Sequence, residues 1–369
     1  MRIAIMGSRG IPNRYGGFEQ FAEYIAPALV EKGHEVFVYN SSAHPYREPS
    51  WKNVKIIRGY DPEDSIGTAG QFIYDFNCIR DSRKRDFDII LQLGYTSSSI
   101  WSFLYPRDAV LVTNMDGLEW KRSKYSKSVQ KFLLKAEKWA VVHSDYLIAD
   151  SKGIQNYLLE KFSKESEFIA YGAKLIAPPT EDFLNVKGLR KFEYNIVLAR
   201  MEPENNIEPV IKGHMSANGD KPLIIIGSYT NKFGEYLYKK YAGDKVQFWG
   251  AVYDLDVLNC LRYYAYIYFH GHSVGGTNPS LLEAMASYAL IAAHDNVFNR
   301  TILENDAFYF SDESDVAALL RKNITREVHD QMLKNNAEKI TNFYSWDHIA
   351  DELEKFFINA LAKSPRRRK

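Results

Sequence analysis

The sequence predicts an α/β protein made of two doubly wound domains that face each other across a cleft. Short apolar runs alternate with segments of helical periodicity along the whole chain, which is typical of right-handed βαβ units in a parallel sheet. A length of 369 residues exceeds what one ordinary core needs and suits two domains. The pattern of strand, turn and helix also begins twice, at residue 2 and again at residue 195.

In the first domain, runs that are apolar almost throughout predict strands buried on both faces of a parallel sheet. These runs cover residues 2–6, 35–39, 54–57, 89–93, 109–113 and 146–149. After Gly17, apolar residues recur at helical spacing to about Lys32, and Gly33 is a typical stop signal. The first strand and the helix after Gly17 therefore form the first βα unit.

The second domain repeats this design after Pro178, Pro179 and a charged segment at residues 187–193. Its predicted strands cover residues 195–199, 223–226, 246–248, 267–269 and 290–293. We therefore expect Rossmann-like domains at residues 1–185 and 186–345. Residues 346–369 are expected to form a helix that crosses back over the first domain, followed by a basic tail.

Composition excludes several classes of protein. With 47 basic and 46 acidic side chains, the chain lacks the basic excess of a general nucleic-acid binder. Cys78 and Cys260 cannot form a disulfide framework or a cysteine-rich zinc site, which favours a reducing compartment. No run approaches the roughly 20 apolar residues of a membrane span, and the N-terminus does not resemble a signal peptide. We expect a cytoplasmic location.

The loops after the strands carry the chemistry, because ligands of doubly wound sheets bind at the carboxyl ends of the strands. The first loop, residues 7–19, lacks the GxGxxG fingerprint of dinucleotide binding. Gly16 and Gly17 directly precede a helix, where they let the backbone approach an anionic ligand. Arg9 and Arg14 add positive charge. The alternative is a glycine-rich turn that binds nothing.

The second loop follows the first strand of the second domain. Arg200 leaves that strand end in a position suited to a bidentate grip on a phosphate. A surface salt bridge from Arg200 to Glu202 or Glu204 is the alternative.

The third loop, residues 270–278, leads into a helix. Asn278 is expected to cap this helix and Pro279 to occupy its first position. The amides from Asn278 to Leu281 and the helix dipole would then form an anion site. Glu283, one turn later, suits two vicinal ribose hydroxyls.

Two histidines open the same loop. His270 and His272 could bind a metal, but the sequence offers no third ligand near them. A hydrogen-bonding or packing role is the alternative.

Two aspartates follow apolar strands of the first domain and are expected to face the cleft. Asp116 precedes Gly117, so turn formation is the alternative for it. Asp150 precedes Ser151, and helix capping is the alternative there.

These segments resemble a known family. Residues 278–286 and Arg200 resemble retaining GT-B glycosyltransferases of family 4. Residues 6–19, 116–122 and 199–206 are similar to the bacterial rhamnosyltransferase-type subgroup, which carries a DUF1972 N-terminal domain. The resemblance covers almost the whole chain. In that family the C-terminal domain binds the nucleotide sugar and the N-terminal domain binds the acceptor.

The resemblance implies retaining transfer of a sugar, L-rhamnose from dTDP- or UDP-rhamnose, to a saccharide acceptor linked to polyprenyl diphosphate. It also implies a role in synthesis of bacterial surface polysaccharide, with no metal or other cofactor and no nucleic-acid partner. Two alternatives are a non-hydrolysing nucleotide-sugar 2-epimerase and a catalytically silent nucleotide-sugar-binding protein.

The resemblance also implies roles for individual residues. The catalytic residues are Asp116, Asp150 and Arg200. The donor site comprises Gly16, Gly17, Arg200, Asn205, Gly276, Thr277, Asn278, Ser280, Leu281 and Glu283. The acceptor site comprises Arg14, Tyr15, Glu19, Glu119, Lys121 and Arg122.

The chain departs from the family pattern at three positions. The first glutamate of the usual pair, eight positions before Glu283, is replaced by Gly275. The usual diphosphate-binding lysine corresponds to Asn205, and the histidine that precedes the aspartate in many members corresponds to Met115. These departures fit a subgroup that uses a deoxysugar.

Basic residues crowd the C-terminus after an amphipathic helix. They are Lys363, Arg366, Arg367, Arg368 and Lys369, and residues 121–127 add further positive charge. Five such groups are enough for reversible attachment to an anionic surface. We therefore expect an anionic membrane as a partner and a peripheral position on the inner face of the plasma membrane. A solvated tail is the alternative.

Overall fold

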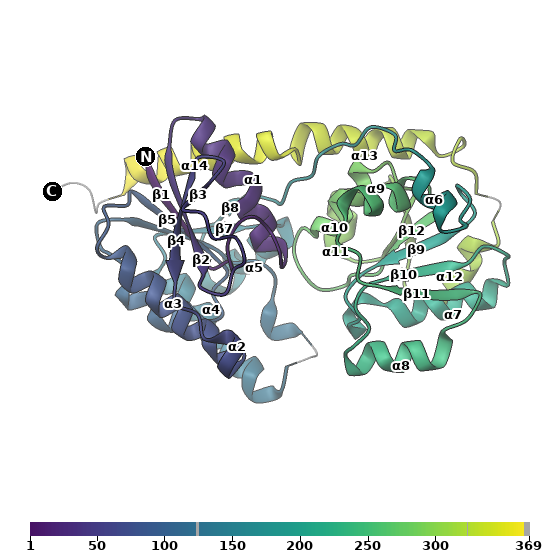
Figure 1. The fold of residues 1–369 in the computed structure, drawn as a ribbon, viewed down its shortest axis with the longest axis horizontal. Helices are drawn as coiled ribbons and strands as arrows, with labels where there is room; N and C mark the ends of the chain where they lie inside the picture. The colour runs from purple at the N-terminus through teal and green to yellow at the C-terminus, as the bar shows by residue number, and fades with distance from the viewer. Residues whose placement is uncertain (123–124, 323, 365–369) are drawn as a thin grey trace. The chain divides into compact units, whose positions relative to one another are not determined.

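The structure, a computed structural model, describes residues 1–122, 125–322 and 324–364. The chain divides into two compact units, and each unit contains its own largely parallel sheet (Figure 1). Unit 1 contains Met1–Lys121, Tyr125–Tyr171 and the C-terminal helix, and unit 2 contains Arg122 and Gly172–Ser345. The prediction of an α/β protein with two doubly wound sheets is confirmed.

Unit 1 has an eight-stranded sheet. In spatial order its strands are β3 (Ser50–Trp51), β4 (Val54–Gly59), β2 (Glu35–Ser41), β1 (Arg2–Met6), β5 (Ile89–Leu93), β6 (Val110–Asn114), β7 (Tyr146–Ala149) and β8 (Glu167–Phe168). All neighbours are parallel except β3 and β4. The apolar runs predicted the longer strands, whereas β3 and β8 are two residues long and carry no pattern.

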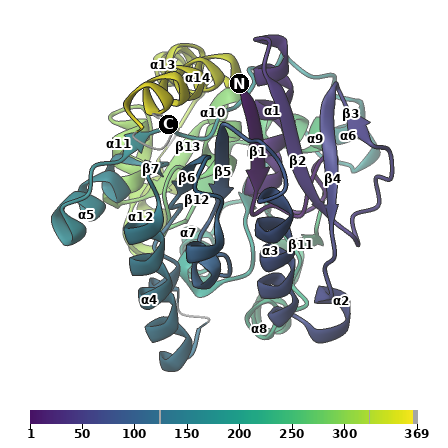
Figure 2. The ribbon, with the colours of Figure 1, turned by 90° about the vertical axis from the view of Figure 1, so that its left-hand side faces the viewer.

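Helices cover both faces of this sheet. They are α1 (Gly17–Glu31), α2 (Glu63–Ile66), α3 (Ala69–Ser82), η1 (Ser99–Leu104), η2 (Glu119–Lys121), α4 (Lys127–His143), α5 (Lys152–Phe162) and α14 (Trp346–Lys363). Ala4 and Met6 of β1 pack with Tyr74 and Ile79 of α3 on one face. The helices α1 and α14 lie side by side on the other face (Figure 2). Alternate side chains of each strand therefore enter two cores.

The C-terminal helix α14 belongs to unit 1, as the sequence leads us to expect. The indole of Trp346 stacks on Tyr24 of α1, with ring centroids 4.6 Å apart and planes 2° apart. The imidazole of His34 contacts the Glu354 carboxylate at 2.7 Å. Aromatic stacking and buried apolar area thus fix the end of the chain on the first helix.

The boundary between the units falls after Tyr171, not at residue 185 as the sequence suggests. Tyr171 packs edge-on against Phe21 in unit 1, with ring centroids 5.8 Å apart. The hydroxyl of Tyr264 donates to the Pro179 carbonyl at 2.6 Å, so the diproline segment is already part of unit 2. The amide of Ala173 donates to the carbonyl of Tyr344 at 2.7 Å. The start and the end of the long segment of unit 2 are therefore neighbours.

Unit 2 has a six-stranded parallel sheet. In spatial order its strands are β11 (Val246–Gly250), β10 (Leu223–Ile226), β9 (Asn195–Leu198), β12 (Ile267–His270), β13 (Ile291–His294) and β14 (Phe308–Phe310). Its helices are α6 (Asp182–Val186), η3 (Pro203–Asn205), α7 (Ile207–Ala217), α8 (Lys232–Tyr241), α9 (Leu255–Tyr263), α10 (Pro279–Ala286), α11 (Val297–Leu303), α12 (Glu313–Leu320) and α13 (Asp330–Phe343). The helices α7, α8 and α12 cover one face of the sheet, and α9 and α10 cover the other (Figure 1).

Each sheet has a topological switch point. In unit 1 the chain builds outward from β1 to one side and then crosses to β5 on the other side. In unit 2 it does the same from β9 and crosses to β12. The loops after these neighbouring strands diverge to opposite faces, which opens a crevice where ligands of such sheets bind. The fold therefore directs attention to the carboxyl ends of β1, β5, β9 and β12.

We predict that Asp75 makes the stability of unit 1 depend on pH. Burial on α3 raises the pKa of this carboxyl to about 7, against the effect of a hydrogen bond from Ser97. The folded state thus holds a proton that the unfolded state releases near pH 4, and stability falls as the pH rises from about 4 to about 7. Asp75→Asn should be more stable than the parent at pH 8 by about 2–4 kcal/mol, because each pH unit between the two pKa values corresponds to roughly 1.4 kcal/mol.

Urea unfolding at pH 5 and pH 8 measures this effect. The exposed Asp64 on α2 provides the control, because Asp64→Asn should keep the parental pH profile. An Asp75→Asn variant whose stability depends on pH as the parent does would refute the assignment.

Candidate functional site

In unit 2, Arg200 lies two residues beyond the end of β9. Its side chain is exposed. The side-chain amide of Asn205 donates to the carbonyl of Arg200 at 2.8 Å. Asn205 is itself buried, so it supports the turn that presents Arg200. The structure therefore gives Asn205 a bond to the backbone of this turn, and its expected phosphate contact stays a prediction.

A tight contact fixes the loop after β12 against the loop after β9. A Cβ atom on Gly271 would lie 2.1 Å from the carbonyl oxygen of Asn205, so only glycine fits there. The side-chain amide of Asn206 donates to the Gly271 carbonyl at 2.8 Å, and the hydroxyl of Ser273 donates to the Glu204 carbonyl at 2.7 Å. The two loops at the switch point are therefore held in one arrangement.

The start of α10 has the predicted cap. The side chain of Asn278 accepts from the Ser280 amide at 2.9 Å, and Pro279 is the first helical residue. The Leu281 amide donates to the Asn278 carbonyl at 3.0 Å. Pro279 has no N–H, so the cap engages the amides expected to bind an anion. The helix dipole and the preceding loop remain for that purpose. In this loop Gly275 adopts φ 133°, and the space that a Cβ would occupy is open.

Glu283 is held by a buried arginine. The guanidinium of Arg262 is fully buried and donates to Oε2 of Glu283. The Oδ1 atom of Asn259 accepts from the same guanidinium at 3.3 Å. Sequence reasoning missed Arg262, because an arginine on α9 twenty-one residues before its partner belongs to no motif. Its effect is to fix the orientation of the carboxylate that the sequence assigns to the ribose.

His270 and His272 stack on each other, with ring centroids 4.4 Å apart and planes 18° apart. Burial lowers the pKa of His270, and the nearby His272 lowers it further. Burial, with the charge of Arg200 as the next cause, lowers the pKa of His272 to about 3. Both imidazoles are therefore neutral at pH 7. Among the described residues, no three His, Cys, Asp or Glu side chains are grouped as metal ligands would be.

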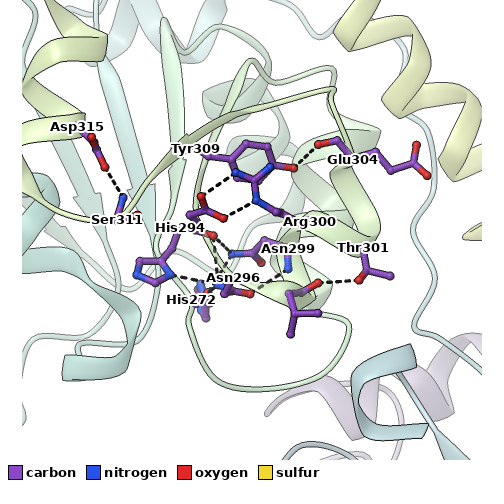
Figure 3. A network of polar contacts seen from close by, with 12 residues as sticks. His272, His294, Asn296, Asn299, Arg300, Thr301, Glu304, Tyr309, Ser311 and Asp315 are labelled. Atoms are coloured by element: carbon purple, nitrogen blue, oxygen red, sulfur yellow. Dashed lines mark hydrogen bonds and ion pairs between the residues drawn. The ribbon is translucent and has the colours of Figure 1, made fainter. Parts of the chain in front are cut away.

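Two asparagines fix the backbone at the ends of β12 and β13 (Figure 3). The side-chain amides of Asn296 and Asn299 donate to the His272 carbonyl at 3.0 and 3.1 Å. Asn299 also donates to the His294 carbonyl at 2.8 Å. One signal in the sequence could have revealed this network, since Asn296 precedes a helical segment and caps α11. The network holds His272 in place from the side of β13.

In unit 1, Asp116 and Asp150 lie directly beyond β6 and β7. Asp116 adopts φ 49°, a left-handed conformation that aspartate and asparagine tolerate. Asp150 is 1% exposed. The helix cap belongs to Ser151, whose hydroxyl accepts from the Ile154 amide at 3.2 Å. Capping therefore does not explain Asp150.

The phenol of Tyr171 is influenced by three residues that the sequence predicts in the site of unit 1, namely Asp116, Asp150 and Glu19. Burial raises its pKa well above the ordinary value, and the charges of Asp116, Asp150 and Glu19 raise it further. A Cβ atom on Gly17 would lie 3.5 Å from the Tyr171 hydroxyl. The phenol is therefore a neutral donor among carboxylates at the start of α1. Sequence reasoning missed it because it is one of 25 tyrosines and belongs to no motif.

Glu19 organises the glycine-rich loop. Its buried carboxylate accepts from the backbone amide of Arg9 at 2.7 Å. The Arg9 guanidinium pairs with Glu63 at 2.7 Å and lies 3.7 Å from the ring centroid of Tyr15. Arg9 is thus already neutralised, whereas Arg14 is exposed. Glu19 and Arg9 shape this loop.

The remaining acceptor candidates follow β6. Glu119 and Lys121 lie in η2, and the Lys121 ammonium is 5.4 Å from the Trp120 ring centroid. The contacts of Arg122 assign it to unit 2, although the sequence places it in the first domain.

Gly16, next to Gly17, is the residue before α1, and its extended backbone needs no glycine.

Two further sequence features concern membranes. Across the described residues, no helix combines the length and apolar character needed to cross a bilayer. Lys363 is the last residue of α14, and Arg366, Arg367, Arg368 and Lys369 lie outside the described residues.

The N-terminal half of the chain matches a known family. Residues 1–174 match the family model described as a domain of unknown function, DUF1972. An uncharacterized glycosyltransferase of Methanocaldococcus jannaschii is 23% identical in an alignment of 370 positions that covers 92% of this chain and 90% of that protein.

Solved structures show the architecture of the whole chain. A sucrose-phosphate synthase from Thermosynechococcus elongatus matches 98% of this chain and all of its own, with a TM-score of 0.81 at 18% identity. HepE from Anabaena, in complex with UDP-glucose, matches 97% of this chain and 99% of its own, with a TM-score of 0.75 at 13% identity. The chain has the GT-B fold. The GT-B prediction made from the Arg200 and α10 segments is therefore confirmed as a statement about the fold.

We predict that Glu283→Ala destabilises this GT-B protein. Removing the carboxylate leaves the guanidinium of Arg262 buried without its charge partner. Breaking such a pair from one side typically costs about 3 kcal/mol or more. Urea unfolding measures the loss, with Glu338→Ala on the exposed side of α13 as the control. Parental stability in Glu283→Ala would contradict the structural role of the pair.

Proposed function

We propose that this protein is a retaining glycosyltransferase. It transfers L-rhamnose from dTDP- or UDP-rhamnose to a saccharide acceptor linked to polyprenyl diphosphate, in the synthesis of a bacterial surface polysaccharide. Unit 2 binds the nucleotide sugar and unit 1 binds the acceptor. The similarity to a glycosyltransferase along 92% of the chain supports the reaction class, and the GT-B fold supports the division of labour.

The observation that carries the proposal is the positive site at the switch point of unit 2. The exposed Arg200, the loop at residues 275–278 and the start of α10 lie at the carboxyl ends of β9 and β12. A departing diphosphate gains charge as the glycosidic bond breaks, and fixed donors and dipoles stabilise that charge without reorganisation. The bonds that lock Gly271 to Asn205 and Asn206 keep these donors in position.

Retention of configuration requires no protein nucleophile in this scheme. The leaving diphosphate accepts the proton of the acceptor hydroxyl on the face from which it departs. Asp116 and Asp150 orient that hydroxyl or stabilise the oxocarbenium-like centre, and the neutral Tyr171 is the phenol on which both charges act.

Two sequence features support the finer assignments. Gly275 supplies no carboxylate to the sugar and Asn205 supplies no ammonium to the diphosphate, which fits a deoxysugar donor. The basic residues that follow α14 fit an acceptor whose lipid holds it at an anionic cytoplasmic leaflet. The protein is accordingly expected on the inner face of the plasma membrane.

The test is a panel of dTDP- and UDP-linked sugars. A donor that binds the folded state raises the melting temperature by mass action, and turnover releases nucleoside diphosphate only when an acceptor is present. Release that depends on the acceptor is the expected result. A donor that changes without acceptor would indicate an epimerase, and binding without turnover would indicate a silent binding protein.

We predict that Arg200→Ala lowers kcat by about 10²–10³-fold, the scale for removing one donor to a developing anion. Its donor affinity should fall as well, since the diphosphate is charged in the ground state. Steady-state kinetics on the selected donor measure both effects. Arg190→Ala, which removes another exposed arginine of unit 2, should behave as the parent. Parental kcat in Arg200→Ala would remove Arg200 from the mechanism.

We predict that Asp116→Asn or Asp150→Asn lowers turnover by at least about 100-fold, the scale for losing the orientation of a reacting group. Asparagine keeps the shape of both side chains and tolerates the left-handed backbone at residue 116. Donor affinity and the melting temperature should stay close to parental values. Asp108→Asn, at an exposed site, is the control. Full activity in both variants would refute the assignment.

A further inference from the structure

The stacked pair of His270 and His272 has buried ring nitrogens that no hydrogen bond satisfies within the described residues. Both ring nitrogens of His270 and Nδ1 of His272 are in this state. His270 is 1% exposed, and His272 is half-buried. Buried polar atoms without partners destabilise a fold, so apolar residues would serve better at these positions if packing were their only role.

The histidine pair lies at the candidate site of unit 2, at the carboxyl end of β12. The rings of Tyr268, His270 and His272 form one stack along β12, with successive centroids 6.3 and 4.4 Å apart. The hydroxyl of Tyr268 contacts the hydroxyl of Ser280 at 2.7 Å, so the stack lies on the face of the sheet that α10 covers. The stack ends with His272, beyond the carboxyl end of β12 at the switch point.

The charge state of the rings restricts the ligand that they can bind. A neutral imidazole offers one donor and one acceptor, so the pair offers two of each. A phosphate oxygen only accepts hydrogen bonds and would leave both acceptor nitrogens unsatisfied. A hydroxyl group both donates and accepts, so it can bond either nitrogen of a neutral imidazole. Arg200 and the start of α10 are better suited to the anion.

We propose that His272, supported by the ring of His270 beneath it, hydrogen-bonds hydroxyl groups of the donor's sugar and thereby selects the sugar. This inference rests on the proposed function, because it assumes a nucleotide sugar in unit 2. His272 is the contact residue, and His270 is a positioning residue. The Asn296 and Asn299 amides on the His272 carbonyl fix the backbone from which the contact residue projects (Figure 3).

The experiment compares a nucleotide sugar with its nucleoside diphosphate. Affinities of UDP-rhamnose against UDP, and of dTDP-rhamnose against dTDP, are measured by calorimetry on the full chain. Phenylalanine keeps the ring stack and removes the nitrogens. His272→Phe should weaken the nucleotide sugar at least tenfold and the nucleoside diphosphate less than twofold.

His270→Phe provides a second readout. Because it removes unsatisfied polar atoms but keeps a ring beneath His272, the melting temperature without ligand should stay the same or rise, and affinity for the nucleotide sugar should fall less than in His272→Phe. A residue kept for folding would show a lower melting temperature and unchanged affinity. His214→Phe is the matched control, since His214 is another buried histidine of unit 2 with an unsatisfied ring nitrogen, on α7. It should leave both affinities unchanged.

The outcomes show whether this inference fails alone or together with the proposed function. Equal weakening of UDP and UDP-rhamnose in His272→Phe would show that the ring binds the base or phosphate, and would overturn the assignment to the sugar. Unchanged affinity for both would do the same. If the parent binds none of these nucleotides or nucleotide sugars, the proposed function fails together with this inference.

Discussion

The contact between Gly271 and the carbonyl of Asn205 is the constraint on which the site of unit 2 depends. No side chain fits at residue 271, because a β-carbon would lie 2.1 Å from that oxygen. This approach lets Asn206 bond the Gly271 carbonyl and lets Ser273 bond the Glu204 carbonyl. Two loops that follow strands far apart in the sequence thus become one rigid edge, and the charged and polar groups on it need no rearrangement when charge develops.

The electrostatics of this edge follow a simple division. Arg200 carries exposed positive charge, whereas Arg262 is buried and its charge is matched by Glu283. The stacked histidines are kept neutral by burial and by the neighbouring arginine. One side of the site is therefore suited to an anion and the other to uncharged hydroxyls. In unit 1 the charged groups are instead negative, and Asp116, Asp150 and Glu19 act on the buried, neutral phenol of Tyr171.

Sequence reasoning succeeded where the signal is local. Apolar runs located the longer strands, and the Asn278–Pro279 pair located the start of α10 to the residue. It failed where a residue acts through a distant partner. Arg262, Tyr171 and Asn299 belong to no motif, and only folding brings them to Glu283, Asp116 and the His272 carbonyl. The domain boundary was also misplaced, because a charged segment looks like a linker although the earlier diproline already packs on unit 2.

The return of α14 to unit 1 has a consequence for the order of folding. Apart from Arg122, unit 2 is one segment from Gly172 to Ser345 inserted in the sequence of unit 1, and Ala173 and Tyr344 are hydrogen-bonded near its two ends. During synthesis, unit 2 can be complete while the aromatic face of α1, with Phe21 and Tyr24, still lacks Trp346. Until α14 is synthesised, this aromatic surface of α1 stays exposed to solvent. It is the stage at which a chaperone would be most useful to this protein.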